Sequence, residues 1–489
     1  MRSLPVTSIG VTCAAALTLP LAAPGTAVPA PVPADATGTV ARAPAAPAAE
    51  PQGSTQSLSL RPLAEAETRT RGGPTAPRSA QPSSPSTRGL LPRDSHRFSL
   101  VGVVWEDPDA ELQGTVQVRT RATGTGGWSG WQDLETHNSD HAADAGSAER
   151  GPGRTRGSTA PLWVGDSDGV DVRVRSDEAA SRHHRSAPAA APLPDGLRVE
   201  LVDPGDDPQP LPEDDATPAS TTSVSTTATP ASSSPRPGAL PEGAALGTAA
   251  TESSAADAGP VPLGTTEIPA PGRTESQEQA VVAAGAEPHV GPRPRIVTRK
   301  GWGADESLRE RSFAYTSTLK AAFVHHSATG NDYTCAQAPS VLRGIYRYHV
   351  ESSGWRDFGY NFAIDKCGTV YEGRAGGVTK AVLGAHTAGF NSDTMGIAVL
   401  GTFDSEAPPA AAVNAIARLT AWKLGLYGRD PEGKVSLVSG GGGTYAKGAQ
   451  AGLHVISGHR DGFATECPGM RLYNKLGAAR TTSAKLQGR

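Results

Sequence analysis

Hydrophobic positions recur in regular order in two stretches of the chain, and the first of these predicts a small β domain. Short runs at 98–105, 115–120, 170–174 and 197–201 are apolar and β-branched or alternate between apolar and polar residues. Gly, Asp and Pro separate the runs. A period of two is typical of antiparallel strands with one buried face. We therefore predict an all-β, sandwich-like domain over residues 95–205, with a loose insertion at about 136–158.

Two tryptophans of this domain, Trp128 and Trp131, allow two interpretations. They could stack on sugar rings, or they could fill the core. We favour the core, because exposed aromatic platforms are rarer than buried tryptophans.

The second ordered stretch, residues 295–485, predicts strands mixed with helices. Apolar runs at 322–325, 361–364, 369–372 and 395–400 have the length of strands. Apolar stripes of helical period run through 338–351 and 409–426, and a third helix is expected near Met470. The fold class predicted here is α/β, with a mixed central β-sheet flanked by helices.

The remaining chain lacks the residues that build a core. Residues 1–97 contain no Phe, Trp or Tyr, and neither does the stretch from 206 to 295. Segments without large apolar side chains cannot offset the entropy lost on folding. We predict a disordered Pro/Ala/Ser-rich spacer at 31–94 and a disordered linker at 206–294.

The first 30 residues have the pattern of a signal peptide. Arg2 precedes an apolar run at 9–21, and small residues follow at 22–30. No other stretch approaches ~20 apolar residues, so we expect a secreted, extracellular protein with no membrane attachment after signal removal. The net charge is −4 and no dense Lys/Arg stripe is present, which argues against nucleic acid as a partner.

Candidate chemistry lies in two short segments far apart in the sequence. Residues 323–327 contain His325 and His326, and residues 457–469 contain His459 and Cys467. Two imidazoles and one thiolate suit Zn²⁺, and three protein ligands leave the fourth position to water, as in catalytic sites. Only one histidine of the pair can reach the metal, because adjacent strand residues point to opposite faces. Spacing alone does not choose between them.

The motifs of residues 295–485 resemble those of the peptidoglycan recognition protein family, also called type-2 amidases. The matching blocks are RKGWGA at 299–304, VHHS at 324–327, GWRDFGYNF at 354–362, YEGR at 371–374, GAHT at 384–387, and GHRD at 458–461 with CPG at 467–469. Six motifs in one order make the resemblance specific, although no single motif would suffice.

The resemblance implies a zinc-dependent N-acetylmuramoyl-L-alanine amidase that hydrolyses the amide between the lactyl group of N-acetylmuramic acid and L-alanine in peptidoglycan. It implies His325, His459 and Cys467 as metal ligands, with Tyr360 beside the metal-bound water and Thr465 as a donor to the oxyanion. It also implies groove residues that contact the muramyl peptide, namely His349, Trp355, Arg374, His386 and Asn391. Recognition-only members lack one or more of the ligands, so the complete set here favours an enzyme.

The cysteines support this interpretation. Cys13 leaves with the signal peptide, and three cysteines in an exported protein suggest one disulfide and one thiol with another role. If Cys335 pairs with Cys367, the free thiolate is Cys467. The closed loop of about 30 residues would stabilise the fold by about 3 kcal/mol.

Several alternatives remain open. A non-catalytic peptidoglycan-binding protein is the second hypothesis, and anchoring of the chain to wall polymer through the β domain is a third. We expect His326 to have a structural role, and Glu372 is one candidate for the proton shuttle. The protein is expected to be a monomer associated with the cell wall.

Overall fold

The computed structural model describes residues 53–63, 87–136, 139–144, 146–147, 149–151, 153–177, 192–207, 266–270 and 289–489. The predicted signal peptide and most of the two predicted spacers lie outside these ranges. Within them, no helix combines the length and apolar character that a membrane crossing requires.

The first part of the described chain is all β, as predicted. Its strands form one sheet in the order β1-β8-β3-β7-β4-β5, with β2 and β6 paired to β3. The strands are β1 (Ser54–Ser59), β2 (Arg61–Pro62), β3 (Thr87–Trp105), β4 (Gly114–Ala122), β5 (Gln132–Leu134), β6 (Gly157–Ser158), β7 (Leu162–Ser176) and β8 (Arg198–Asp203). Register shifts interrupt the pairing of β3 with β7 at three points. The inward side chains of β3, β4, β7 and β8 make one apolar core.

Strands extend into both predicted spacers, so those boundaries were wrong. β1, β2 and the start of β3 lie within 31–94. β1 is an edge strand that pairs with β8, and Leu58 alone of its residues packs against the core, so it needs no aromatic side chain. In the second spacer, Ile268 and Val290 are fully buried against the C-terminal sheet. Aromatic content alone therefore underestimates how much of the chain is ordered.

The expectation that Trp128 fills the core was also wrong. Trp128 is 38% exposed, and the Arg119 guanidinium lies 5.3 Å from its ring centroid. Trp131 is partly buried, and Arg173 lies 3.9 Å from its ring. Cation–π contacts cover these rings in place of core packing.

The C-terminal part contains the predicted mixed sheet. Seven strands follow the order β17-β11-β14-β12-β13-β10-β9, and β15 pairs separately with β16. The strands are β9 (Glu267–Ile268), β10 (Ile296–Val297), β11 (Ala321–His326), β12 (Phe362–Ile364), β13 (Val370–Glu372), β14 (Thr394–Val399), β15 (Lys434–Val438), β16 (Gln450–His454) and β17 (Ile456–Gly458). β11 runs parallel to β14 and β17, whereas β12 and β13 run antiparallel to each other.

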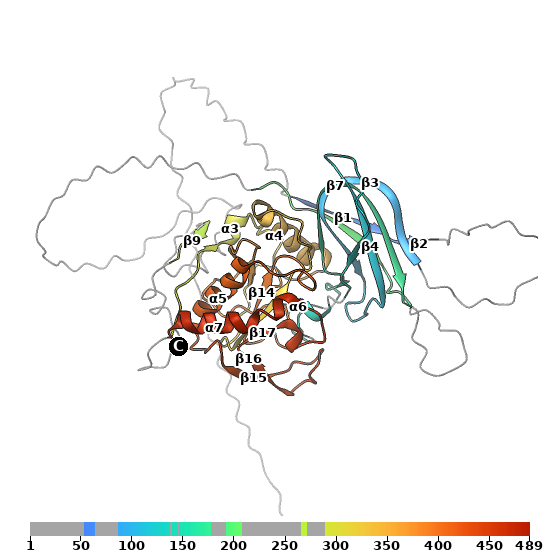
Figure 1. Ribbon diagram of the computed structural model, residues 1–489. Helices are drawn as coiled ribbons and strands as arrows, with labels where there is room; N and C mark the ends of the chain where they lie inside the picture. The colour runs from blue at the N-terminus through green and yellow to red at the C-terminus, as the bar shows by residue number, and fades with distance from the viewer. Residues whose placement is uncertain are drawn as a thin grey trace, which may run out of the picture. The chain divides into compact units, whose positions relative to one another are not determined.

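Helices cover both faces of this sheet, which confirms the fold class. They are α3 (Arg299–Trp302), α4 (Ala338–Arg347), α5 (Ala410–Gly425), α6 (Met470–Tyr473) and α7 (Leu476–Gln487), with short helical turns η2 (Cys335–Gln337), η3 (Tyr348–Ser352) and η4 (His459–Asp461). α5 and α7 lie side by side on one face, where they bury the largest apolar cluster (Figure 1). α4 packs on the other face against a second apolar cluster. This second cluster also contains Leu100, Val104 and Trp163 of the β part.

Candidate metal centre and groove

Neighbouring parallel strands bring two distant motifs together at their carboxyl ends. In the register of β11 with β17, Val324 lies opposite Gly458. The next residue in each segment is a histidine, His325 or His459, so both enter the same end of the sheet. Cys467 follows in the loop after η4, and its Sγ lies 3.7 Å from Nδ1 of His325. The three side chains expected to bind zinc thus converge.

Strand alternation separates the two adjacent histidines. Val324 packs into the cluster beneath α5 and α7, and the side chain of His325 points to the opposite face. The His325 ring centroid lies 4.5 Å from that of His459. His326 is buried elsewhere, with Nε2 3.4 Å from a carboxylate oxygen of Glu135. Only His325 of the pair faces the cluster.

The cluster fits a zinc ion in geometry and chemistry. Tetrahedral Zn²⁺ with ordinary bond lengths separates a nitrogen and a sulfur ligand by about 3.6 Å, close to the 3.7 Å between His325 and Cys467. Both ring nitrogens of His459 are buried and have no hydrogen-bond partner among the described residues. Such orphaned polar atoms are rare unless a ligand satisfies them. A fourth side chain, His141, joins the group, and the four ligand atoms all lie within 4.8 Å of one another.

Electrostatics prepare the imidazoles for a cation. Burial lowers the pKa of His459 to about 3, although the carboxylate of Asp140 opposes the shift. Burial and then the neighbouring His459 lower the pKa of His325 well below its ordinary value. Both rings are therefore neutral at pH 7 and have a free lone pair. Burial raises the pKa of the Cys467 thiol well above its usual range, and a bound dication would reverse that shift.

The two predicted catalytic side chains flank the cluster. The Tyr360 ring centroid lies 5.2 Å from that of His325, and only 5% of the residue is exposed. Burial, with a smaller effect of Cys467, raises the pKa of Tyr360 well above its ordinary value, so its hydroxyl keeps its proton. Thr465 accepts a hydrogen bond of 3.2 Å from the backbone N–H of Cys467 and lies beside the carboxylate of Asp140.

Of the residues expected to contact the muramyl peptide, His349 and Trp355 form a buried aromatic pair. Their ring centroids are 4.3 Å apart, at an interplanar angle of 31°. Nδ1 of His349 accepts a hydrogen bond of 3.2 Å from the N–H of Gly359. This bond fixes the His349 ring against Gly359, the residue that precedes Tyr360.

His386 and Asn391 form a second pair behind the cluster. The Asn391 side-chain oxygen accepts bonds of 2.7 and 3.0 Å from the N–H groups of His386 and Thr387. The His386 ring lies over Gly396 of β14, where a Cβ atom would come within 2.4 Å of its Cγ. Asn391 and Gly396 therefore fix the loop in its position over the sheet.

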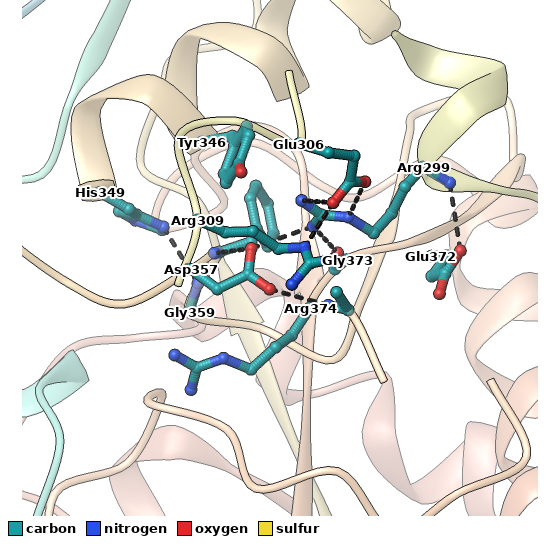
Figure 2. Close-up of polar contacts among 12 residues, drawn as sticks. Arg299, Glu306, Arg309, Tyr346, His349, Asp357, Gly359, Glu372, Gly373 and Arg374 are labelled. Atoms are coloured by element: carbon teal, nitrogen blue, oxygen red, sulfur yellow. Dashed lines mark hydrogen bonds and ion pairs between the residues drawn. The ribbon is translucent and has the colours of Figure 1, made fainter. Parts of the chain in front are cut away.

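A buried arginine connects the segments that carry Glu306, Asp357 and Gly373 (Figure 2). Arg299 is 1% exposed, and its guanidinium contacts Glu306 at 2.7 Å, Asp357 at 3.1 Å and the carbonyl oxygen of Gly373 at 2.5 Å. Asp357 in turn accepts a bond of 2.9 Å from the N–H of Ala375. This network orients the chain near Tyr360 and on both sides of Arg374. Arg374 is the last residue of the YEGR motif, which begins in β13.

Glu372 belongs to the same network. Its carboxylate accepts a bond of 3.1 Å from the backbone N–H of Arg299, and its carbonyl accepts one of 2.7 Å from the indole of Trp302. Glu372 is not a member of the His/Cys cluster. Its position therefore gives no support to a role as proton shuttle.

The expected loose insertion was the largest error. We call residues 139–156 the inserted segment; 145, 148 and 152 lie outside the described residues. Asp140, His141 and Glu149 are all less than 10% exposed, and His141 enters the metal cluster. Arg374, expected to bind substrate, forms an ion pair with Glu149. No sequence pattern singled out His141, because an Asp-His pair within a run of small residues has no periodicity or motif.

The disulfide and the free thiol are as expected. Cys335 and Cys367 are bonded, with Cα atoms 6.2 Å apart. Cys467 is the only free cysteine in the described ranges, and it is buried.

Comparisons with known proteins match the β part and the C-terminal part to two separate families. A family described as Rv3811 N-terminal galactose-binding domain-like matches residues 47–192, and the N-acetylmuramoyl-L-alanine amidase family matches residues 315–470. Peptidoglycan-recognition protein SC2 of Drosophila simulans is 33% identical over 181 residues, covering 37% of this chain and 84% of that protein. Human N-acetylmuramoyl-L-alanine amidase is 32% identical over 215 residues, covering 41% of this chain and 32% of that protein. The solved structure of wild-type Drosophila PGRP-LB shares 27% identity, covers 38% of this chain and 93% of its own, and has a TM-score of 0.30.

Proposed function

Because this chain belongs to the peptidoglycan recognition protein family of type-2 amidases, we propose that it is a secreted, zinc-dependent N-acetylmuramoyl-L-alanine amidase. It would hydrolyse the amide between the lactyl group of N-acetylmuramic acid and the L-alanine of the stem peptide. The family and its relatives support peptidoglycan binding or amidase activity. The proposal of a zinc enzyme rests on the site itself.

The convergence of His325, His459 and Cys467 is the observation that carries the proposal. These residues would hold the ion through two neutral imidazoles and one sulfur, a donor set that zinc prefers. When bound, zinc would supply a polarising charge for the scissile carbonyl and for the attacking water.

The chain's own residues would orient the substrate and stabilise charge. The Tyr360 hydroxyl keeps its proton and can donate to the oxygen on which negative charge develops. Thr465 would be a second donor; its hydroxyl lies 3.2 Å from the backbone nitrogen of Cys467, which supports this role. The ring pair of His349 and Trp355 would contact the muramyl peptide.

Export to the cell wall is part of the proposal. The bond between Cys335 and Cys367 is typical of an oxidising, extracellular compartment. One chain supplies every residue of the cluster, so a monomer can carry out the reaction.

Digestion of purified peptidoglycan, with mass analysis of the products, tests the reaction. An amidase releases stem peptides with a free N-terminal alanine from intact glycan. The His459→Ala variant should lose both bound zinc and activity, because it removes one of the three ligands. His454→Ala, which replaces a histidine outside the cluster, is the matched control and should retain both. Products cut in the sugar chain, or an active His459→Ala variant without zinc, would contradict the proposal.

The same experiment tests the second hypothesis. A peptidoglycan-binding protein without catalysis would sediment with insoluble peptidoglycan and release no stem peptide from it. Zinc content measured on the same samples should be one ion per wild-type chain.

A further inference from the structure

The inserted segment lies against the metal cluster and contacts two of the residues expected to bind the muramyl peptide, Asn391 and Arg374. Oδ1 of Asp144 accepts hydrogen bonds of 2.7 Å from the N–H of Gly389 and 2.7 Å from the side-chain amide of Asn391. The N–H of Ala388 donates a bond of 2.8 Å to the carbonyl oxygen of Asp140. The segment thus satisfies the side-chain amide of Asn391, a residue that the resemblance assigns to binding of the muramyl peptide.

A buried ion pair anchors the segment further along. Glu149 and Arg374 pair with side chains that are each 5% exposed. Burial of either charge alone would be strongly destabilising, so the two residues fit each other specifically. The carbonyl of Arg154 packs directly on Gly354, where a Cβ atom would lie 2.0 Å from that oxygen. Gly354 also has a φ of +75°, so two constraints favour glycine there.

His141 is the fourth member of the ligand cluster. Its Nε2 is 3.6 Å from Sγ of Cys467, the separation expected of two ligands on one zinc ion, about 3.6 Å. The His141 ring lies 4.5 Å from the ring of His459 and 5.9 Å from that of Tyr360. Its other nitrogen, Nδ1, contacts the Asp140 carboxylate at 2.9 Å, an arrangement that orients metal-binding histidines.

The β part keeps the segment close to the groove. The segment leaves the sheet after β5 and returns at β6. That sheet shares an apolar cluster with α4. The Tyr348 hydroxyl also donates to the carbonyl oxygen of Thr159, at 3.1 Å. A segment tethered at both ends to a docked sheet has a high effective concentration at the groove.

We propose that the inserted segment is an intramolecular inhibitor of the metal centre. His141 is the fourth protein ligand, and Asp144 and Glu149 hold the segment in the groove where a muramyl peptide would bind. The inference rests on the proposed amidase function. Four protein ligands leave no position for water, as in structural zinc sites. Hydrolysis would then require the segment to leave, and the rate of hydrolysis would follow the fraction of chains in which the segment has left.

The coordination of a substituted metal tests the closure without any measurement of activity. The full chain is loaded with Co²⁺, and its visible absorption is recorded during titration with azide. The wild-type spectrum should respond little, because four protein ligands exclude the anion. The His141→Ala variant should bind azide at least about tenfold more tightly. Equal azide responses from the two proteins would overturn the proposal.

Two further variants separate inhibition from simple unfolding. Asp144→Asn combined with Glu149→Gln weakens the anchors of the segment and keeps His141, so it should also increase azide binding. His96→Ala replaces an exposed histidine of β3 and should behave as wild type. If His141→Ala does not fold, the double variant alone decides: an azide response equal to that of the wild type would refute the inhibitor.

Digestion assays then separate the inhibitor from the amidase. His141→Ala should release stem peptides at least about tenfold faster than the wild type and should sediment more with insoluble peptidoglycan. Equal or slower release would contradict inhibition, and the amidase would stand. Increased azide and peptidoglycan binding with no stem peptide from any variant would refute the amidase, and the segment would remain a plug on a binding site.

Discussion

Lowering the pH from 7 to 5 should destabilise the folded chain by about 2 kcal/mol through His349 alone. Burial, followed by the effects of His141 and Arg374, lowers the pKa of His349 from 6.5 to about 3. Below pH 6.5 the unfolded chain therefore takes up a proton that the folded chain does not. The stabilisation is complete above pH 6.5 and is lost as the pH falls towards 3.

The variant His349→Asn isolates this effect. An asparagine oxygen can still accept the N–H of Gly359, but the side chain does not titrate. The variant will be less stable at pH 7, because it loses the contact with Trp355. Its further loss between pH 7 and pH 5 should be about 2 kcal/mol smaller than that of the wild type.

Urea unfolding followed by tryptophan fluorescence measures both free energies, with the same metal load for each protein. Other buried histidines titrate equally in the two proteins, so their contributions cancel in the difference. His96→Asn, at an exposed position, is the control and should follow the wild type. If wild type and His349→Asn lose the same stability between pH 7 and pH 5, the linkage argument is wrong.

Two other predictions concern stability. Arg299→Met removes the cation that contacts Glu306 and Asp357, and should cost about 3–5 kcal/mol in urea unfolding; a loss below about 1 kcal/mol would mean that these carboxylates find other partners. Replacing both Cys335 and Cys367 by Ala opens a loop with a sequence separation of 32 and should cost about 3–4 kcal/mol. An unchanged thermal midpoint in the double variant would show that the disulfide does not constrain the unfolded chain.

The sequence by itself determined most strands and helices of both folded parts and the two segments that contain His325, His459 and Cys467. The alternating runs correspond to β3, β4, β7 and β8, and the helical stripes to α4 and α5. Periodicity is a local property, and it records which face of each element is buried. The two ligand motifs were also visible, because each is short and contiguous. Local pattern could not predict β1, because that strand depends on pairing with β8. It also could not predict that Trp128 is exposed, because the position of that ring depends on its contact with Arg119.

Only the tertiary structure decided which histidine of the pair faces the cluster and what fills the groove. Alternation required His325 and His326 to diverge, but the packing of the two sheet faces determined their directions. The inserted segment is the clearest case. Its ion pair joins Glu149 to Arg374, 225 residues later in the chain. A charge is buried only when its partner is also present, and no local pattern records a partner at that distance.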